Sequence, residues 1–156
     1  MTNIRIALAQ VNPTVGDLLG NRALVVETTA QAAAAGADLV AFPEMVLTGY
    51  PIEDLALRPS FQQACAGSLE MLASDLDAAG FGDVVVVVGH LAPPPADADD
   101  RRGFNAAAVL HRGAVVADYA KHHLPNYGVF DEQRYFRSGD LPCRIRLGDV
   151  DVAVVI

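Results

Sequence analysis

The chain has 156 residues, of which 52% are apolar and 19% charged. This length suits one domain with a hydrophobic core, and the composition excludes an intrinsically disordered chain. The formal net charge of −8 argues against nucleic acid or an anionic membrane as a partner. The amino-terminal segment carries no charged leader, and no apolar run approaches the roughly 20 residues that span a bilayer, so we expect a soluble, cytoplasmic protein.

The first elements in chain order predict a βαβ unit. Residues 4–11 form an apolar, β-rich run, and the alanine-rich stretch that follows is predicted to be a helix. That helix is expected to start at Asp17 or Asn21, which are good amino-terminal caps, and to end at Gly36. Residues 38–44 are almost continuously apolar, which predicts a strand buried on both faces.

The later elements predict a second helix and two hairpins. The helix carries its apolar residues at helical spacing (Phe61, Cys65, Leu69, Leu72 and Leu76). Residues 83–90 predict a buried strand, and the proline-rich stretch 93–103 an exposed loop. Residues 104–123 predict two strands that turn at Arg112 and Gly113, and residues 143–156 predict a second hairpin that turns near Gly148.

The predicted fold class is α/β, a layered domain whose helices lie on one face of a mixed sheet. The chain does not obviously supply a cover for the other face. We therefore expect apolar surface that promotes association or poor solubility. The closing stretch 150–156 has the apolar density of a strand inside a sheet.

Two charged residues follow predicted strands. Glu44 ends the strand 38–44, and Lys121 ends the second strand of the 104–123 hairpin. The carboxyl ends of strands in open α/β sheets are where ligand sites form, and a lysine there can balance a carboxylate or stabilise an oxyanion. Taken singly, each residue is more often an ordinary solvated surface charge.

An aromatic loop follows Lys121. Four aromatic residues (Tyr127, Phe130, Tyr135 and Phe136) fall within ten positions of a chain that is only 6% aromatic. Tyr127 and Phe130 could line a pocket, and the charges of Asp131, Glu132 and Arg134 could brace it. The alternative is a loop that buries its own aromatic rings.

The remaining reactive residue types give weaker signals. Cys65 belongs to the apolar face of a helix, Cys143 begins a strand, and the two have no zinc-binding spacing. His122 and His123 are adjacent, so in an extended segment they point to opposite sides and cannot easily chelate one metal, and we predict no metal site. His90 is expected to be a hydrogen-bonded histidine at a strand end. No phosphate-binding, dinucleotide-binding or serine-hydrolase motif is present.

The combined motifs resemble the nitrilase superfamily of carbon–nitrogen hydrolases. The stretches "DLVAFPEMVLTGYP" and "YAKHHLPNYGVFDEQRYF" carry the resemblance. Within that superfamily, "GYPIEDLALRPSF" and "KHHLPNYGVFDEQRYFRSG" resemble the glutaminase domain of glutamine-dependent NAD synthetases. The resemblance runs along the chain from "IALAQVNPTVGD" (residue 6) onward and implies that residues 1–156 are the first part of an α-β-β-α sandwich, incomplete in this chain.

The resemblance also implies a set of site residues. Glu44 matches the general base and Lys121 the cation of a Glu, Lys, Cys triad. Glu132 matches a second glutamate that orders the site, Tyr127 and Phe130 would lie on the glutamine side of the pocket, and Tyr50 would lie close to the base. Removal of a thiol proton by a base beside a cation is a sound route to a nucleophilic thiolate.

The family's nucleophilic cysteine follows a strand like 150–156, and the sequence contains no residue after Ile156. We therefore expect the chain to be the amino-terminal part of a longer homo-oligomeric enzyme and to be inactive alone. By resemblance, the glutaminase part needs no cofactor. A second domain, absent here, would use ATP and magnesium to amidate deamido-NAD. Alternatives are a stand-alone amidase or carbamoylase of the superfamily, or a non-catalytic binding or assembly module of that fold.

Overall fold

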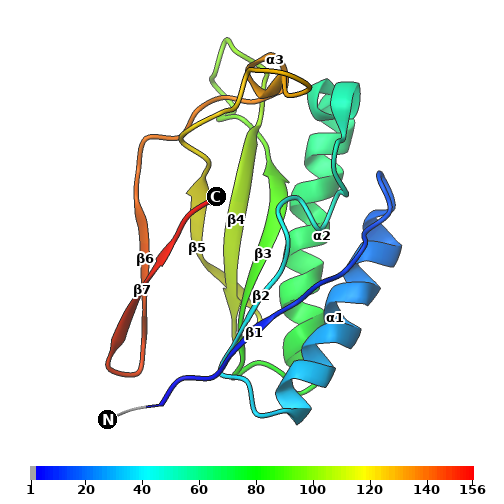
Figure 1. Cartoon of the computed structure of the whole chain (residues 1–156). Helices are drawn as coiled ribbons and strands as arrows, with labels where there is room; N and C mark the ends of the chain where they lie inside the picture. Colours follow the sequence, from blue (N-terminus) through cyan, green and yellow to red (C-terminus); the bar gives the residue numbers. More distant parts are fainter. Residues whose placement is uncertain (1–2) are drawn as a thin grey trace.

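The computed structural model describes residues 3–156 and contains a five-stranded mixed sheet (Figure 1). Its strands, in spatial and chain order, are β1 (Ile6–Leu8), β2 (Leu39–Ala41), β3 (Val85–Ala92), β4 (Phe104–His111) and β5 (Ala114–Ala120). The first three strands are parallel, and β4 runs antiparallel to both neighbours. The predicted βαβ unit and the predicted hairpin are confirmed.

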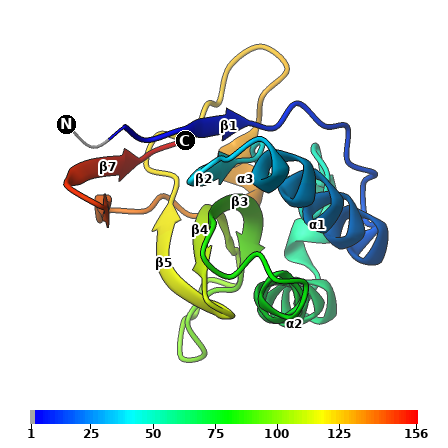
Figure 2. The same cartoon turned by 90° about the horizontal axis from the view of Figure 1, so that it is seen from below.

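Two long helices cover one face of the sheet, as predicted (Figures 1 and 2). Helix α1 spans Leu18–Ala34 and helix α2 spans Pro59–Ala78. The side chain of Asp17 caps α1 by accepting the amide hydrogen of Gly20. Within the described residues, no helix is long and apolar enough to cross a membrane.

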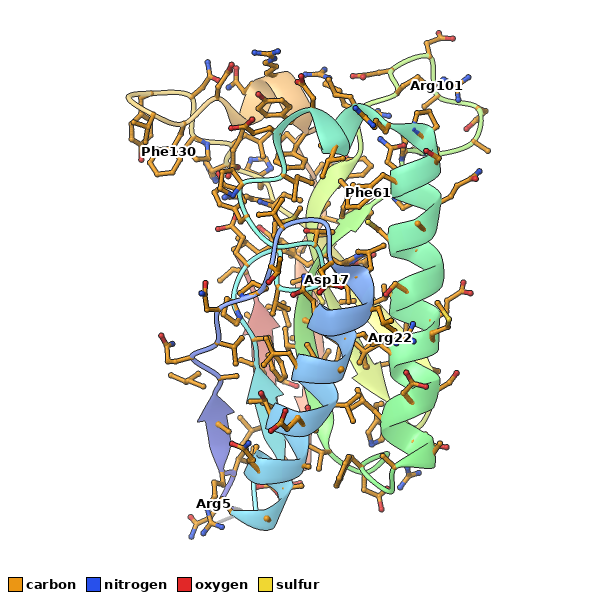
Figure 3. The ribbon with its side chains drawn as sticks, turned by 90° about the vertical axis from the view of Figure 1, so that its right-hand side faces the viewer. Arg5, Asp17, Arg22, Phe61, Arg101 and Phe130 are labelled. Atoms are coloured by element: carbon orange, nitrogen blue, oxygen red, sulfur yellow. The ribbon has the colours of Figure 1, made fainter. Side chains whose placement is uncertain are left out.

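The helices pack on the sheet through a continuous apolar core. The core takes Val25 from α1, Leu72 from α2, and Val40 and Val88 from the sheet, all with no exposed surface. Arg22 of α1 forms an ion pair of 3.0 Å across the helix pair with Asp75 of α2, at the rim of this core (Figure 3). Burial of side chains of this size contributes about 1.5–3 kcal/mol each, so the apolar stripe predicted for α2 fixes that helix on the sheet.

A hairpin covers part of the opposite face (Figure 2). Strands β6 (Cys143–Leu147) and β7 (Val150–Val154) form a separate two-stranded sheet. Cys143 and Val154 pack against Tyr119 of β5 and against β4. The expectation that the chain supplies no cover for this face was therefore only partly correct. The predicted hairpin of residues 143–156 is confirmed, with its turn at Gly148. The place inside a sheet that the apolar density of 150–156 suggested is not found among the described residues, because β7 pairs only with β6 and Val155 beyond it is 75% exposed.

The site end of the sheet is set by strand direction. Strands β2, β3 and β5 end at one edge, and the antiparallel β4 begins there. The loops at this edge carry a 3₁₀ helix, η1 (Glu53–Leu57), and the short helix α3 (Glu132–Tyr135), at the top of Figure 1. Residues far apart in sequence therefore meet at this edge.

Candidate active site

Glu44 is positioned by a close approach of two backbones. The chain leaves β2 and crosses β3 at Gly89, whose carbonyl accepts a hydrogen bond of 3.0 Å from the amide of Leu47. A Cβ at position 89 would lie 2.2 Å from the backbone nitrogen of Met45, so only glycine allows this crossing. The backbone next to Glu44 is therefore held against the sheet, while its side chain stays 36% exposed.

Lys121 is held by backbone hydrogen bonds on both sides. Its amide donates to the carbonyl of Asn105 on β4 at 2.8 Å, and its carbonyl accepts from the amide of Gly139 at 2.9 Å. The residue is only 8% exposed. Lys121 directly follows Ala120, the last residue of β5.

The Lys121 ammonium lies between two carboxylates. Its Nζ donates to Glu44 Oε1 at 2.7 Å and to Glu132 Oε1 at 3.1 Å, and it lies 3.0 Å from Glu132 Oε2. Burial alone would lower the pKa of Lys121, but the hydrogen bonds and charges of Glu44 and Glu132 outweigh it and raise that pKa above the ordinary lysine value. The lysine is therefore a fixed cation, and an ammonium with three N–H groups keeps one donor for a further acceptor.

Tyr50 joins the cluster through Glu132. Its hydroxyl donates to Glu132 Oε1 at 3.0 Å, and Glu132 itself is 3% exposed. Burial, and then the hydrogen bond and charge of Glu132, raise the pKa of Tyr50 well above its usual value. Tyr50 therefore stays protonated and acts as a hydrogen-bond donor. It contacts the second glutamate; no hydrogen bond joins it to Glu44 among the described residues.

Asn105 is a member of the cluster that the sequence reasoning missed. It lies at the start of β4, has no exposed surface, and donates from Nδ2 to Glu44 Oε1. A single polar residue in the otherwise apolar run "FNAAAVL" is a signal that could have identified it.

The aromatic loop forms a rim beside the cluster. A cavity of about 140 Å³ is lined by residues of this loop, including Phe130 and Glu132, and by Tyr50 and its neighbours. Tyr127 packs edge to face against Phe130 at 5.9 Å, although Tyr127 is 71% exposed. Figure 3 shows Phe130 on the loop at this end of the molecule. The loop does not bury Tyr127, and Phe130 faces a cavity next to Glu132.

Neither cysteine is hydrogen-bonded to Glu44, Lys121 or Glu132 among the described residues, and both thiols are poor nucleophiles. Cys65 has no exposed surface and packs in the core beneath η1 and α3. Burial raises the pKa of its thiol to about 12. Burial, and then the charge of Asp118, raise the pKa of Cys143. Both thiols therefore remain protonated near neutral pH, as expected for small buried apolar side chains.

The histidines have hydrogen-bonding roles. His90 is 2% exposed, and its Nε2 lies 3.1 Å from Asp118 Oδ1. The expectation of a hydrogen-bonded strand-end histidine therefore holds only in part, because Nδ1 of His90 is buried without a hydrogen-bond partner among residues 3–156 and β3 continues to Ala92. His122 Nδ1 lies 2.6 Å from the carbonyl oxygen of Gly139. Across residues 3–156, no group of three or more His, Cys, Asp or Glu side chains has an arrangement that could hold a metal ion.

Comparison with known proteins gives two kinds of relatives, glutamine-dependent NAD synthetases and an amidase. The glutamine-dependent NAD(+) synthetases of Thermotoga maritima and Aquifex aeolicus are 41% and 39% identical to this chain. These alignments cover 100% and 98% of this chain but only 26% and 25% of the relatives, so the chain spans about a quarter of their length.

Solved structures agree with this result. The glutamine-dependent NAD+ synthetase of Acinetobacter baumannii, in complex with ADP, superimposes with a TM-score of 0.84 at 35% identity, over 99% of this chain and 28% of that one. An amidase from Nesterenkonia sp. superimposes with a TM-score of 0.74 at 26% identity, over 97% of this chain and 54% of that one.

These structures share the mixed sheet and the helices of this chain, as the predicted fold class requires. The matching segment of the synthetases is the amino-terminal, glutaminase part. The model of the carbon-nitrogen hydrolase family matches residues 5–156, which is nearly the whole chain. The chain belongs to the carbon–nitrogen hydrolase family.

Proposed function

We propose that the chain supplies the general base and the cation of a glutaminase site that releases ammonia from glutamine within a glutamine-dependent NAD synthetase. The observation that carries the proposal is the Lys121 ammonium held between Glu44 and Glu132 at the strand-end edge. The relatives' names and the TM-score of 0.84 support glutamine as the substrate.

In this mechanism, Glu44 accepts the proton of a cysteine thiol, and the thiolate attacks the side-chain carbonyl carbon of glutamine. Lys121 lies beside the oxygen that becomes negative, and its remaining N–H stabilises that oxyanion. The C–N bond breaks as Glu44 returns its proton to the departing nitrogen, which leaves as ammonia. Water then attacks the thioester, Glu44 takes the proton of the water, and glutamate and the free thiol are released.

Cys65 and Cys143 are unsuitable as the thiol of this mechanism, because both are buried and both have raised pKa values. We therefore propose that the nucleophile belongs to a segment outside residues 1–156 and that the isolated chain releases no ammonia. We assign the ATP- and magnesium-dependent amidation of deamido-NAD to a further domain. We also propose that the complete enzyme is a homo-oligomer.

The cavity beside Glu132 supports a binding role for the aromatic loop. Phe130 lines it together with Tyr50, and Tyr127 packs on Phe130. A small amide with an aliphatic stem fits a pocket with aromatic walls and a charged end. We assign Phe130 to contact with glutamine, Tyr127 to support of Phe130, and Tyr50 and Glu132 to support of Lys121.

The test is ammonia release from glutamine by the protein expressed from the complete gene that carries this sequence. Glu44→Gln keeps the shape of the side chain and removes its basicity, so it should abolish ammonia release, while synthesis from added free ammonia should continue. Ammonia release that survives Glu44→Gln would contradict the assignment of the base.

The second candidate is a stand-alone amidase of the same family, which the TM-score of 0.74 with the Nesterenkonia amidase favours. That enzyme would hydrolyse simple amides and would form no NAD from deamido-NAD, ATP and glutamine. A third candidate is a non-catalytic module of this fold, which would show neither reaction. The two assays together separate the three candidates.

A further inference from the structure

Glu44 has two carboxylate oxygens in different environments. Oε1 accepts one hydrogen bond from Lys121 Nζ at 2.7 Å and a second from Asn105 Nδ2. No described residue donates to Oε2, and the Glu44 side chain is 36% exposed. Two donors occupy the lone pairs of Oε1, so Oε2 is the oxygen that remains able to accept a proton.

We propose that Asn105 is a positioning residue that fixes the Glu44 carboxylate so that only Oε2 acts as the base. This inference rests on the proposed function and deepens it, because it identifies the basic atom and the residue that selects it. Lys121 alone is a point donor at the end of a flexible stem. A second donor from a rigid strand fixes the rotation of the carboxylate.

The position of Asn105 suits this role. Its backbone carbonyl accepts the amide hydrogen of Lys121 at 2.8 Å, while its side chain holds Glu44. One residue of β4 therefore fixes both the strand end that carries the cation and the carboxylate of the base. Because β4 is antiparallel, its beginning is next to the ends of β3 and β5, and Asn105 pairs with Leu91 of β3.

The second amide atom of Asn105 argues against a purely structural role. Asn105 Oδ1 is buried and has no hydrogen-bond partner among residues 3–156. An unpartnered buried acceptor costs roughly 1–3 kcal/mol, and only Nδ2 of the amide can face a carboxylate. By contrast, both side-chain atoms of Asn21, 2% exposed at the start of α1, have partners. The fold therefore leaves the Asn105 Oδ1 unsatisfied and retains the hydrogen bond from Asn105 Nδ2 to Glu44.

The experiment measures kcat and KM of ammonia release in the protein from the complete gene, with Asn105→Ala and Asn105→Asp. We expect Asn105→Ala to lower kcat about 10²-fold, the scale of a misplaced catalytic group, with a small change in KM.

Asn105→Asp distinguishes a hydrogen-bond-donating role of Asn105 from a purely packing role. It keeps the shape of asparagine and replaces the donor with an acceptor, so it should impair kcat at least as much as Asn105→Ala. If packing were the role of Asn105, Asn105→Asp would be the milder change, and that result would overturn the inference.

Gln62→Ala is the matched control, since it removes a buried amide whose Nε2 donates to the backbone carbonyls of Ala56 and Arg101 and to no atom of the segment that carries Glu44. It should lower the melting temperature and leave kcat and KM unchanged. A kcat for Asn105→Ala equal to that of this control would also overturn the inference while leaving the proposed function intact. A wild-type protein that releases no ammonia would overturn both.

Discussion

Replacement of Lys121 should destabilise the isolated chain more than replacement of either glutamate. Lys121→Met leaves two carboxylates facing each other without a cation, one of them the 3% exposed Glu132. Loss of one partner from a buried ion pair typically costs about 3–5 kcal/mol. Against a total stability of about 5–15 kcal/mol for a domain, this is a large fraction.

The two glutamate variants define the expected order. Glu132→Gln leaves Lys121 paired with Glu44, so it removes one charge-assisted hydrogen bond and should cost about 1.5–3 kcal/mol. Glu44→Gln should cost less, since its side chain is 36% exposed and the pair is screened by water. The order of destabilisation is therefore Lys121, then Glu132, then Glu44.

Urea unfolding of residues 1–156 at neutral pH, followed by circular dichroism, measures this order. Equal slopes against urea are required, so that midpoints report stability alone. Asp83→Asn is a control, because its ion pair with Arg112 joins side chains that are 87% and 71% exposed, and it should change the midpoint little. A Lys121→Met chain no less stable than Glu132→Gln would refute the reasoning.

Three further predictions use the same chain. Because the pKa of Lys121 is raised, its ion pairs should contribute their full share of the folding stability below the ordinary lysine pKa of about 10.4. In urea titrations, the stability difference between wild type and Lys121→Met should decline only above that pH. Cys65, with a pKa of about 12, should react with a thiol reagent at pH 8 only as fast as the fold opens; immediate labelling would contradict its burial. Gly89→Ala should lower the melting temperature, because its Cβ would overlap the Met45 backbone. The control Gly67→Ala lies in open space on α2 and should raise the free energy of unfolding by about 0.5–1 kcal/mol.

The sequence was most informative where local patterns decide the structure. Asp17 and Gly36 bound helix α1 as predicted, and the Arg112 and Gly113 turn forms with positive φ at both residues. The hairpin of residues 143–156 also forms as predicted, but the apolar density of 150–156 did not show which sheet this strand joins. Pairing with β6 leaves one face of β7 in water.

In the candidate site too, residues marked by a local pattern were predicted and a residue placed by long-range strand pairing was not. Glu44 and Lys121 were predicted from their places at strand ends, and the structure brings them to 2.7 Å. Asn105 was missed, because its contact with Glu44 joins residues 61 positions apart and depends on the antiparallel direction of β4. A polar residue in an apolar strand marks such a position only after the pairing of the strands is known.

The two carboxylates of the cluster are attached to the fold in different ways. Glu44 and Lys121 follow strands of the sheet, and their backbones are fixed by hydrogen bonds to β3 and β4. Glu132 begins the four-residue helix α3 in the aromatic loop, and its side chain contacts Lys121 Nζ and the Tyr50 hydroxyl. A helix of one turn is not stable alone, so these contacts anchor the loop. The Lys121 charge therefore serves both the base and the position of Phe130, and loss of that charge should disturb chemistry and substrate binding together.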